Sequence, residues 1–70
     1  MIDTIELTPR EKQVARLLSR GYSAVYIARR LYISKRTVET HVGRIYGKLG
    51  VSTRDELIER AEHGTLYNVI

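Results

Sequence analysis

Apolar residues recur along this chain at intervals of three and four positions, the spacing that places them on one face of an α-helix. The first such pattern follows residues 8–11, TPRE, which form a capping box with proline at the first helical position. Gly21 ends the pattern, because glycine readily adopts the left-handed conformation that closes a helix. The spacing therefore predicts a helix over about residues 9–20.

Two further helical patterns lie so close together that only a short turn can join them. Ser23 suits the N-cap of a helix over about residues 24–31, and Ser34 suits that of another over about residues 35–49. A turn this short predicts a steep crossing between the two, the helix-turn-helix arrangement. The second of these helices has one apolar stripe, made of Val38, Val42, Ile45 and Leu49.

A last helical pattern begins with a second capping box at residues 53–56, TRDE, and predicts a helix over about residues 54–62. No segment has strand-like alternation of useful length. The predicted fold is therefore all-α: a four-helix bundle containing a helix-turn-helix. It is expected to be a single domain over residues 1–70, with its core in residues 7–62.

Composition narrows the class of protein. The chain has 70 residues and no cysteine, so neither a disulfide nor a cysteine-based zinc site can support its small core. No apolar run approaches the ~20 residues of a membrane span, and the N-terminus lacks the basic and apolar regions of a secretory signal. We therefore expect a soluble, cytoplasmic protein that does not enter a membrane.

Positive charge is concentrated in the middle of the chain. The formal net charge is +4, but residues 12–48 carry nine of the Lys and Arg side chains against one acid, Glu39, while both flanking segments are net acidic. Such a block favours a polyanionic partner, most often nucleic acid. A solvated helix surface that happens to be basic is the alternative.

The apolar stripe of the third predicted helix also determines which side faces outward. Arg36, Thr40, Gly43 and Gly47 then point away from the core. Each glycine costs ~1 kcal/mol of helix stability relative to alanine, so two of them on one face are unusual. Neutral drift is one explanation. The other is that missing side chains let the helix backbone lie deep in a groove, and the major groove of duplex DNA admits one α-helix.

Several side chains on this outer face have chemistry suited to DNA. Lys35 and Arg36 add full charges to a helix N-terminus that already attracts phosphate. Thr40 can hydrogen-bond a base or place its methyl group against that of thymine. Glu39 can accept a hydrogen bond from cytosine N4, or it can pair with Lys35 or Arg36 along the helix.

Taken together, these motifs resemble the LuxR/GerE-type DNA-binding domain, over about residues 7–62. That family is a four-helix bundle whose third helix reads the major groove, and its members regulate bacterial transcription as dimers, often through the fourth helix. They usually sit at the C-terminus of a longer regulator. The matching residues are Leu7-Thr8-Pro9-Arg10-Glu11, Gly21-Tyr22-Ser23, Ile27-Ala28, Leu31, Ile33-Ser34, Thr37-Val38, His41-Val42, Lys48-Leu49-Gly50-Val51 and Arg54.

The resemblance implies roles for particular residues. Base reading falls on Glu39, Thr40 and Gly43, to which the charge at the helix start adds Arg36. The expected phosphate contacts are Ser23, Ser34, Lys35, Thr37, Arg44 and Lys48. A homodimer through the fourth helix would use Arg54, Ile58 and Glu62.

Two departures from the family pattern stand out. Some members have lysine where this chain has Glu39 and Gly43, so fewer side chains are expected to contact the bases directly here. Tyr32 occupies a position where many helix-turn-helix proteins have glycine in a left-handed turn. Because a tyrosine with positive φ is strained, we expect the turn to adopt a different local form.

Other functions are weaker candidates. His41 and His63 have no histidine or cysteine three or four residues away, so neither a metal site nor a cofactor is expected. No catalytic triad, carboxylate pair or glycine-rich phosphate loop is present, so we expect neither an enzyme nor a small-molecule site. A promoter-reading helix of a sigma factor remains an alternative, as does a helical protein adaptor that uses Ile58, Leu66, Val69 and Ile70.

Overall fold

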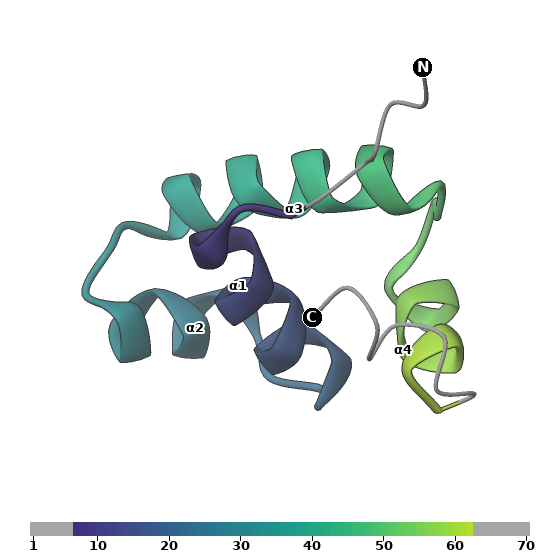
Figure 1. Ribbon diagram of the computed structural model, residues 1–70. Helices are drawn as coiled ribbons and strands as arrows, with labels where there is room; N and C mark the ends of the chain where they lie inside the picture. The colour runs from purple at the N-terminus through teal and green to yellow at the C-terminus, as the bar shows by residue number, and fades with distance from the viewer. Residues whose placement is uncertain (1–6, 63–70) are drawn as a thin grey trace, which may run out of the picture.

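Four α-helices make up the part of the chain that the computed structural model describes, residues 7–62. They are α1 (Pro9–Ser19), α2 (Ala24–Leu31), α3 (Lys35–Leu49) and α4 (Arg54–Glu62). The predicted all-α fold is confirmed, as are the bounds of the last three helices, while α1 ends one residue earlier than expected. In Figure 1, α3 runs along one side of the molecule, with α1 and α2 beneath its first half and α4 beneath its end.

Each helix begins at a side-chain cap. The Thr8 hydroxyl accepts a hydrogen bond from the Glu11 N–H at 3.1 Å, and the Thr8 N–H donates to the Glu11 carboxylate at 2.9 Å, which completes the predicted capping box. Thr53 and Glu56 form the same reciprocal pair at the start of α4. Ser23 and Ser34 cap α2 and α3, each by accepting from the N–H three residues later. These caps fix the helix starts at the positions that the sequence specifies.

Three helices end in the same way, with one residue in the left-handed conformation. The residues are Gly21, Tyr32 and Gly50, with φ of 92°, 59° and 69°. In each case the next N–H donates to the carbonyl five residues before it, which satisfies the end of the helix. The expectation that Tyr32 would avoid positive φ is therefore wrong. The turn keeps the ordinary helix-closing geometry with a tyrosine at this position, a residue that is 94% exposed.

The core forms where α1 meets the other three helices. Ile27, Val38, Ile45 and Leu57 are fully buried there, one or two from each helix that packs on α1. Ile33, in the turn between α2 and α3, packs against this cluster, as expected for a residue that fills the joint. Helix α1 thus contacts each of the other three helices, and α3 packs against both α1 and α2.

Hydrogen bonds from two arginines attach α4 to the rest of the domain. The Arg54 guanidinium donates through Nε to the Leu18 carbonyl, near the end of α1, at 3.3 Å. Arg60 donates to the Leu49 carbonyl at the end of α3. Leu57 and Ala61 are buried beside these bonds. None of the four described helices is long and apolar enough to cross a membrane.

Candidate nucleic-acid interface

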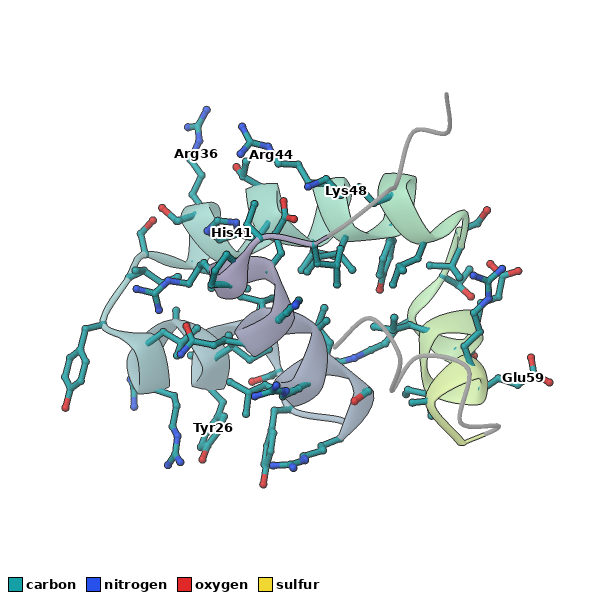
Figure 2. All side chains as sticks on the ribbon, in the orientation of Figure 1. Tyr26, Arg36, His41, Arg44, Lys48 and Glu59 are labelled. Atoms are coloured by element: carbon teal, nitrogen blue, oxygen red, sulfur yellow. The ribbon has the colours of Figure 1, made fainter. Side chains whose placement is uncertain are left out.

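The two sides of α3 have opposite character. Val38 and Ile45 are completely buried, and Val42 and Leu49 pack against the core, as the apolar stripe predicts. Arg36, Thr40, Gly43 and Arg44 are exposed on the other side. Figure 2 shows the Arg36 and Arg44 side chains pointing away from the domain, opposite to Tyr26 of α2. A long helix face is therefore open and positively charged.

The middle of this outer face has no side chains. A Cβ atom built at Gly43 or Gly47 would meet nothing within 4 Å, so neither glycine is required by a close approach inside the domain. Both residues are helical, and their backbone conformation does not require glycine either. The absence of side chains thus serves no purpose in the packing of the domain, and it leaves the helix backbone accessible from outside.

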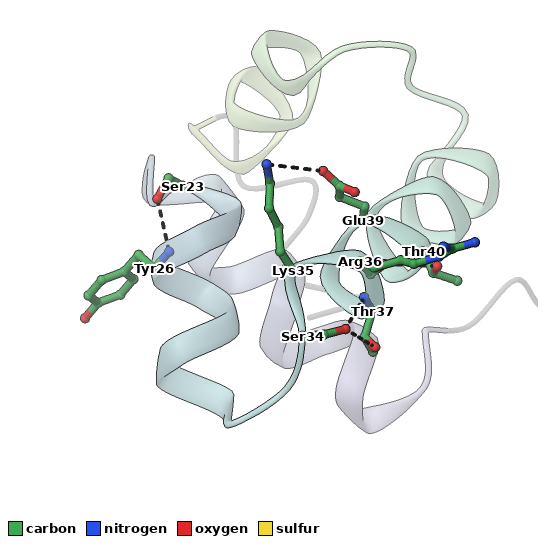
Figure 3. Close-up of polar contacts among 8 residues, drawn as sticks. All are labelled: Ser23, Tyr26, Ser34, Lys35, Arg36, Thr37, Glu39 and Thr40. Carbon is green, nitrogen blue, oxygen red and sulfur yellow. Dashed lines mark hydrogen bonds and ion pairs between the residues drawn. The ribbon is translucent and has the colours of Figure 1, made fainter.

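Hydroxyl groups gather at the start of α3 (Figure 3). The Ser34 oxygen accepts from the Thr37 N–H at 3.0 Å and lies 2.8 Å from the Thr37 hydroxyl. Both residues are exposed, beside the positive end of the helix dipole. The structure therefore brings together two of the predicted phosphate contacts. A third, Ser23, caps α2 through the Tyr26 N–H at 3.1 Å.

Two of the predicted base-reading side chains are engaged with α3 itself. The Glu39 carboxylate lies 3.8 Å from the Lys35 ammonium, one turn earlier, and both side chains are mostly exposed. The Thr40 hydroxyl donates to the Arg36 carbonyl at 3.1 Å. Of the two interpretations of Glu39, the free domain displays the ion pair with Lys35 along the helix. The Arg36 side chain points away from this pair and runs beside Thr40 (Figure 3).

Lys48 differs from the other predicted phosphate contacts because its partner is a buried carboxylate on another helix. Its ammonium donates to the Glu11 carboxylate at 2.7 Å, and only 2% of the Glu11 side chain is exposed. Burial raises the pKa of this carboxyl, but the hydrogen bonds from Lys48 and Thr8, with the Lys48 charge, outweigh that effect and hold the pKa below its usual 4.5. Lys48 therefore neutralises a buried carboxylate and links α3 to α1.

The capping box accounts for one role of Glu11, and its second role, as the buried partner of Lys48, was not predicted from the sequence. A signal was present: Glu11 occupies the same face of α1 as Val14 and Leu18, where an apolar residue is expected. Lys48 likewise lies next to the inward stripe of α3, between Ile45 and Leu49. An acid and a base at the margins of two facing stripes are the pattern of a buried pair.

The proposed dimer residues fall into different environments. Arg54 is half-buried and bonded to α1, and its Nη2 is buried without a hydrogen-bond partner in the described structure. Ile58 is half-buried, and the Glu62 side chain lies outside the described residues.

His41 is half-buried at the edge of the α3 stripe. The alternative adaptor surface at Leu66, Val69 and Ile70 also lies outside the described residues, as does His63.

Comparison with known proteins agrees with this architecture. A sequence model of the family described as bacterial regulatory proteins, luxR family, matches residues 6–61. A Mycobacterium bovis protein named as the HTH-type transcriptional regulator Mb0914c is 49% identical over 55 residues, which cover 79% of this chain and 6% of that protein. The HTH-type transcriptional regulator MalT of Yersinia pestis is 42% identical over 62 residues, 89% of this chain and 7% of that protein.

The chain thus spans 6–7% of the length of these relatives, and it matches them in the segment that contains the helix-turn-helix. The family match covers all four helices up to Ala61. Both named relatives are HTH-type transcriptional regulators. The chain therefore belongs to the luxR family of bacterial regulatory proteins, with α2 and α3 as its helix-turn-helix.

Proposed function

We propose that this domain binds double-stranded DNA in a sequence-specific manner, with α3 lying in the major groove. The observation that carries the proposal is the outer face of α3. It is exposed from Arg36 to Gly47, bears no side chain at Gly43 or Gly47, and is flanked by the outward guanidinium groups of Arg36 and Arg44. A bare helix backbone between cationic side chains fits a groove whose walls are phosphate.

Base reading is assigned to the first three turns of α3. Arg36 can donate two hydrogen bonds to guanine, and Gly43 lets the helix approach the bases closely. The Thr40 hydroxyl already donates to its own helix, so its methyl group and its oxygen lone pairs are what it offers to a base. To accept a hydrogen bond from cytosine, Glu39 would have to break its ion pair with Lys35. Breaking this pair costs little free energy, because both side chains are mostly exposed and the charged groups lie 3.8 Å apart.

Phosphate binding is assigned to the ends of two helices and to nearby cations. Ser23 and Ser34 occupy the N-caps of α2 and α3, where backbone N–H groups and the helix dipole attract an anion. Thr37 and Lys35 lie beside the second of these sites, and Arg44 lies two turns further along α3. Lys48 contributes its charge from the far end of α3 while it remains bonded to Glu11.

The domain is proposed to act as a homodimer, as the DNA-binding part of a longer regulator that works on chromosomal DNA in the cytoplasm. A single domain offers one recognition helix and so reads few base pairs, whereas two domains on half-sites one helical turn apart, ~10 bp, read twice as many. Ile58, with its half-buried side chain on α4, is the apolar residue available for such a contact, beside Arg54 and Glu62.

Selection of bound fragments from random duplexes tests sequence specificity directly. We expect recovery of a common motif, and we expect the affinity for random duplex to fall with salt by about 0.9 log units per log unit of salt for each phosphate neutralised. The Arg36→Glu variant should no longer enrich the motif. Arg10→Glu, the same change at an exposed position of α1, should still enrich it. Binding that does not respond to salt, or selection without a motif, would contradict the proposal.

A further inference from the structure

A shallow hollow between α1 and α2, which we call the arginine hollow, combines an apolar floor with a cationic rim. Its volume is about 170 Å³, and none of its lining residues is acidic. Leu17 and Leu31 are half-buried and pack against the core, so they form the floor of the hollow. The arginines are exposed and form its rim. The lining residues are Gln13, Arg16, Leu17, Arg20, Arg30 and Leu31.

The size of the arginine hollow suits one apolar side chain of a partner. An engineered cavity of ~150 Å³ holds benzene, so a volume of this order admits one aliphatic or aromatic group. Leu17 and Leu31 supply the matching apolar surface. Around such an anchor, Arg20 and Arg30 offer planar guanidinium groups, which recognise carboxylates by paired hydrogen bonds.

The arginine hollow lies away from the proposed DNA face. Arg30 follows Tyr26 by one helical turn on α2, and Figure 2 shows Tyr26 pointing to the side of the domain opposite Arg36 and Arg44. On α1, Gln13, Arg16 and Arg20 are exposed on the side away from the buried Val14 and Leu18, and the half-buried Leu17 lies at the margin between the two sides. A duplex lying along α3 therefore leaves this surface uncovered.

We propose that the arginine hollow binds an acidic helical segment of a protein partner, with one apolar side chain between Leu17 and Leu31 and carboxylates on Arg20 and Arg30. Nucleic acid would pair equally well with the arginines, but its sugar–phosphate backbone offers nothing to fill the apolar floor. An amphipathic helix presents both features at once, because residues three and four apart share a face. This surface is independent of DNA binding by α3.

The test uses the fluorescein-labelled peptide EELLDELLEE and measures its anisotropy with the whole chain. We expect saturable binding that is lost with EEAADEAAEE, which lacks the apolar anchor, and with KKLLKKLLKK, which reverses the charge. Arg30→Glu should weaken binding about tenfold or more, as the loss of a charge-assisted pair predicts. Arg29→Glu is the matched control, an exposed neighbour in the same turn that does not line the hollow, and should change the affinity by less than about twofold.

Amide chemical shifts of the wild-type protein keep the test decisive if a variant fails to fold, as circular dichroism would reveal. Peptide binding should shift residues 13–20 and 30–31 and leave the start of α3 unmoved. Absence of saturable binding, equal losses in Arg29→Glu and Arg30→Glu, or shifts elsewhere would overturn the proposal. So would displacement of the peptide by a random DNA duplex, which would assign the arginine hollow to nucleic acid.

Discussion

The ammonium of Lys48 lies 2.7 Å from the carboxylate of Glu11, a residue 37 positions earlier in the chain. This bond joins the end of α3 to the first turn of α1, where the same carboxylate also accepts from the Thr8 N–H at 2.9 Å. One buried side chain thus fixes both the start of α1 and the placement of α3. The relationship changes what substitution of Lys48 would measure.

Lys48→Ala should lower the free energy of unfolding by about 2 kcal/mol, because it leaves a buried carboxylate without its cation. The value lies below the usual range for a broken buried pair, since a third of the Lys48 side chain is exposed and water can partly replace it. Urea unfolding measures the change. Arg44→Ala, on the exposed side of α3, is the control and should have little effect on stability. Equal stability of both variants would show that the pair contributes nothing.

Acid should destabilise the domain through Glu11. Because the folded pKa of this carboxyl lies below its usual 4.5, the ionised form stabilises the fold above pH 4.5, and that contribution is lost as the pH falls through the folded pKa. Unfolding free energies measured from pH 7 to pH 3 should decline below pH 4.5. The Glu11→Gln variant should have a lower free energy of unfolding than the wild-type protein at pH 7. Its free energy of unfolding should also change less between pH 4.5 and pH 3. A parallel decline in both proteins would assign the acid sensitivity to other groups.

Tyr32→Gly should raise the free energy of unfolding by up to about 1 kcal/mol, because glycine adopts positive φ without strain and the exposed ring loses almost no packing. Thermal unfolding checks the change. Gly50→Ala is the reciprocal experiment at the end of α3, where φ is also positive, and should lower stability by about the same amount. Loss of stability in Tyr32→Gly would mean that the tyrosine ring makes a contact worth more than the strain.

Gly43→Ala and Gly43→Leu separate folding from DNA binding. Alanine should stabilise the free domain by about 1 kcal/mol, since the position is helical and a Cβ there meets nothing. Leucine should also leave the fold intact but should block close approach of α3 to the bases and so weaken DNA binding. Circular dichroism and duplex titration give the two readouts. A collapsed helical signal in Gly43→Leu would contradict the outward placement of this residue.

Thr40→Ala and Arg44→Ala should affect DNA binding in different ways. The threonine change should cost about 1–3 kcal/mol on the selected motif and little on random duplex, as expected for a base contact. The arginine change should weaken both alike and lower the salt slope by about 1, as expected for a phosphate contact. Titrations of both duplexes at several salt concentrations distinguish the two patterns. Arg44 is a better choice than Lys48 for testing a phosphate contact, because Lys48 also stabilises the fold.

The helices could be predicted closely because the signals that define them are local. Thr8, Ser23, Ser34 and Thr53 each act on an N–H three residues away, so the sequence alone places them. Which side of α3 is buried followed from its periodicity in the same way. These features need no knowledge of how distant segments meet.

The expectations that failed or were missing depend on tertiary structure. Tyr32 adopts positive φ because the turn closing α2 must deliver Ile33 to the core, and that packing outweighs a local preference. The Glu11–Lys48 pair and the Arg54 bond to Leu18 join residues 36 or 37 positions apart, beyond the reach of any helical spacing rule. The arginine hollow likewise requires α1 and α2 to be placed side by side. Local chemistry identified the candidate side chains, but only the packing shows which of them are already occupied.

The unfilled space above Gly43 and Gly47 has a consequence for how such a domain can diversify. A residue introduced there changes the outer surface of α3 without disturbing Val38 or Ile45, which are buried on its other side, so no compensating change in the core is required. If α3 reads DNA as proposed, operator preference and architecture are inherited separately. Single codon changes at these two positions would then alter the target sequence while the core that specifies the fold stays the same.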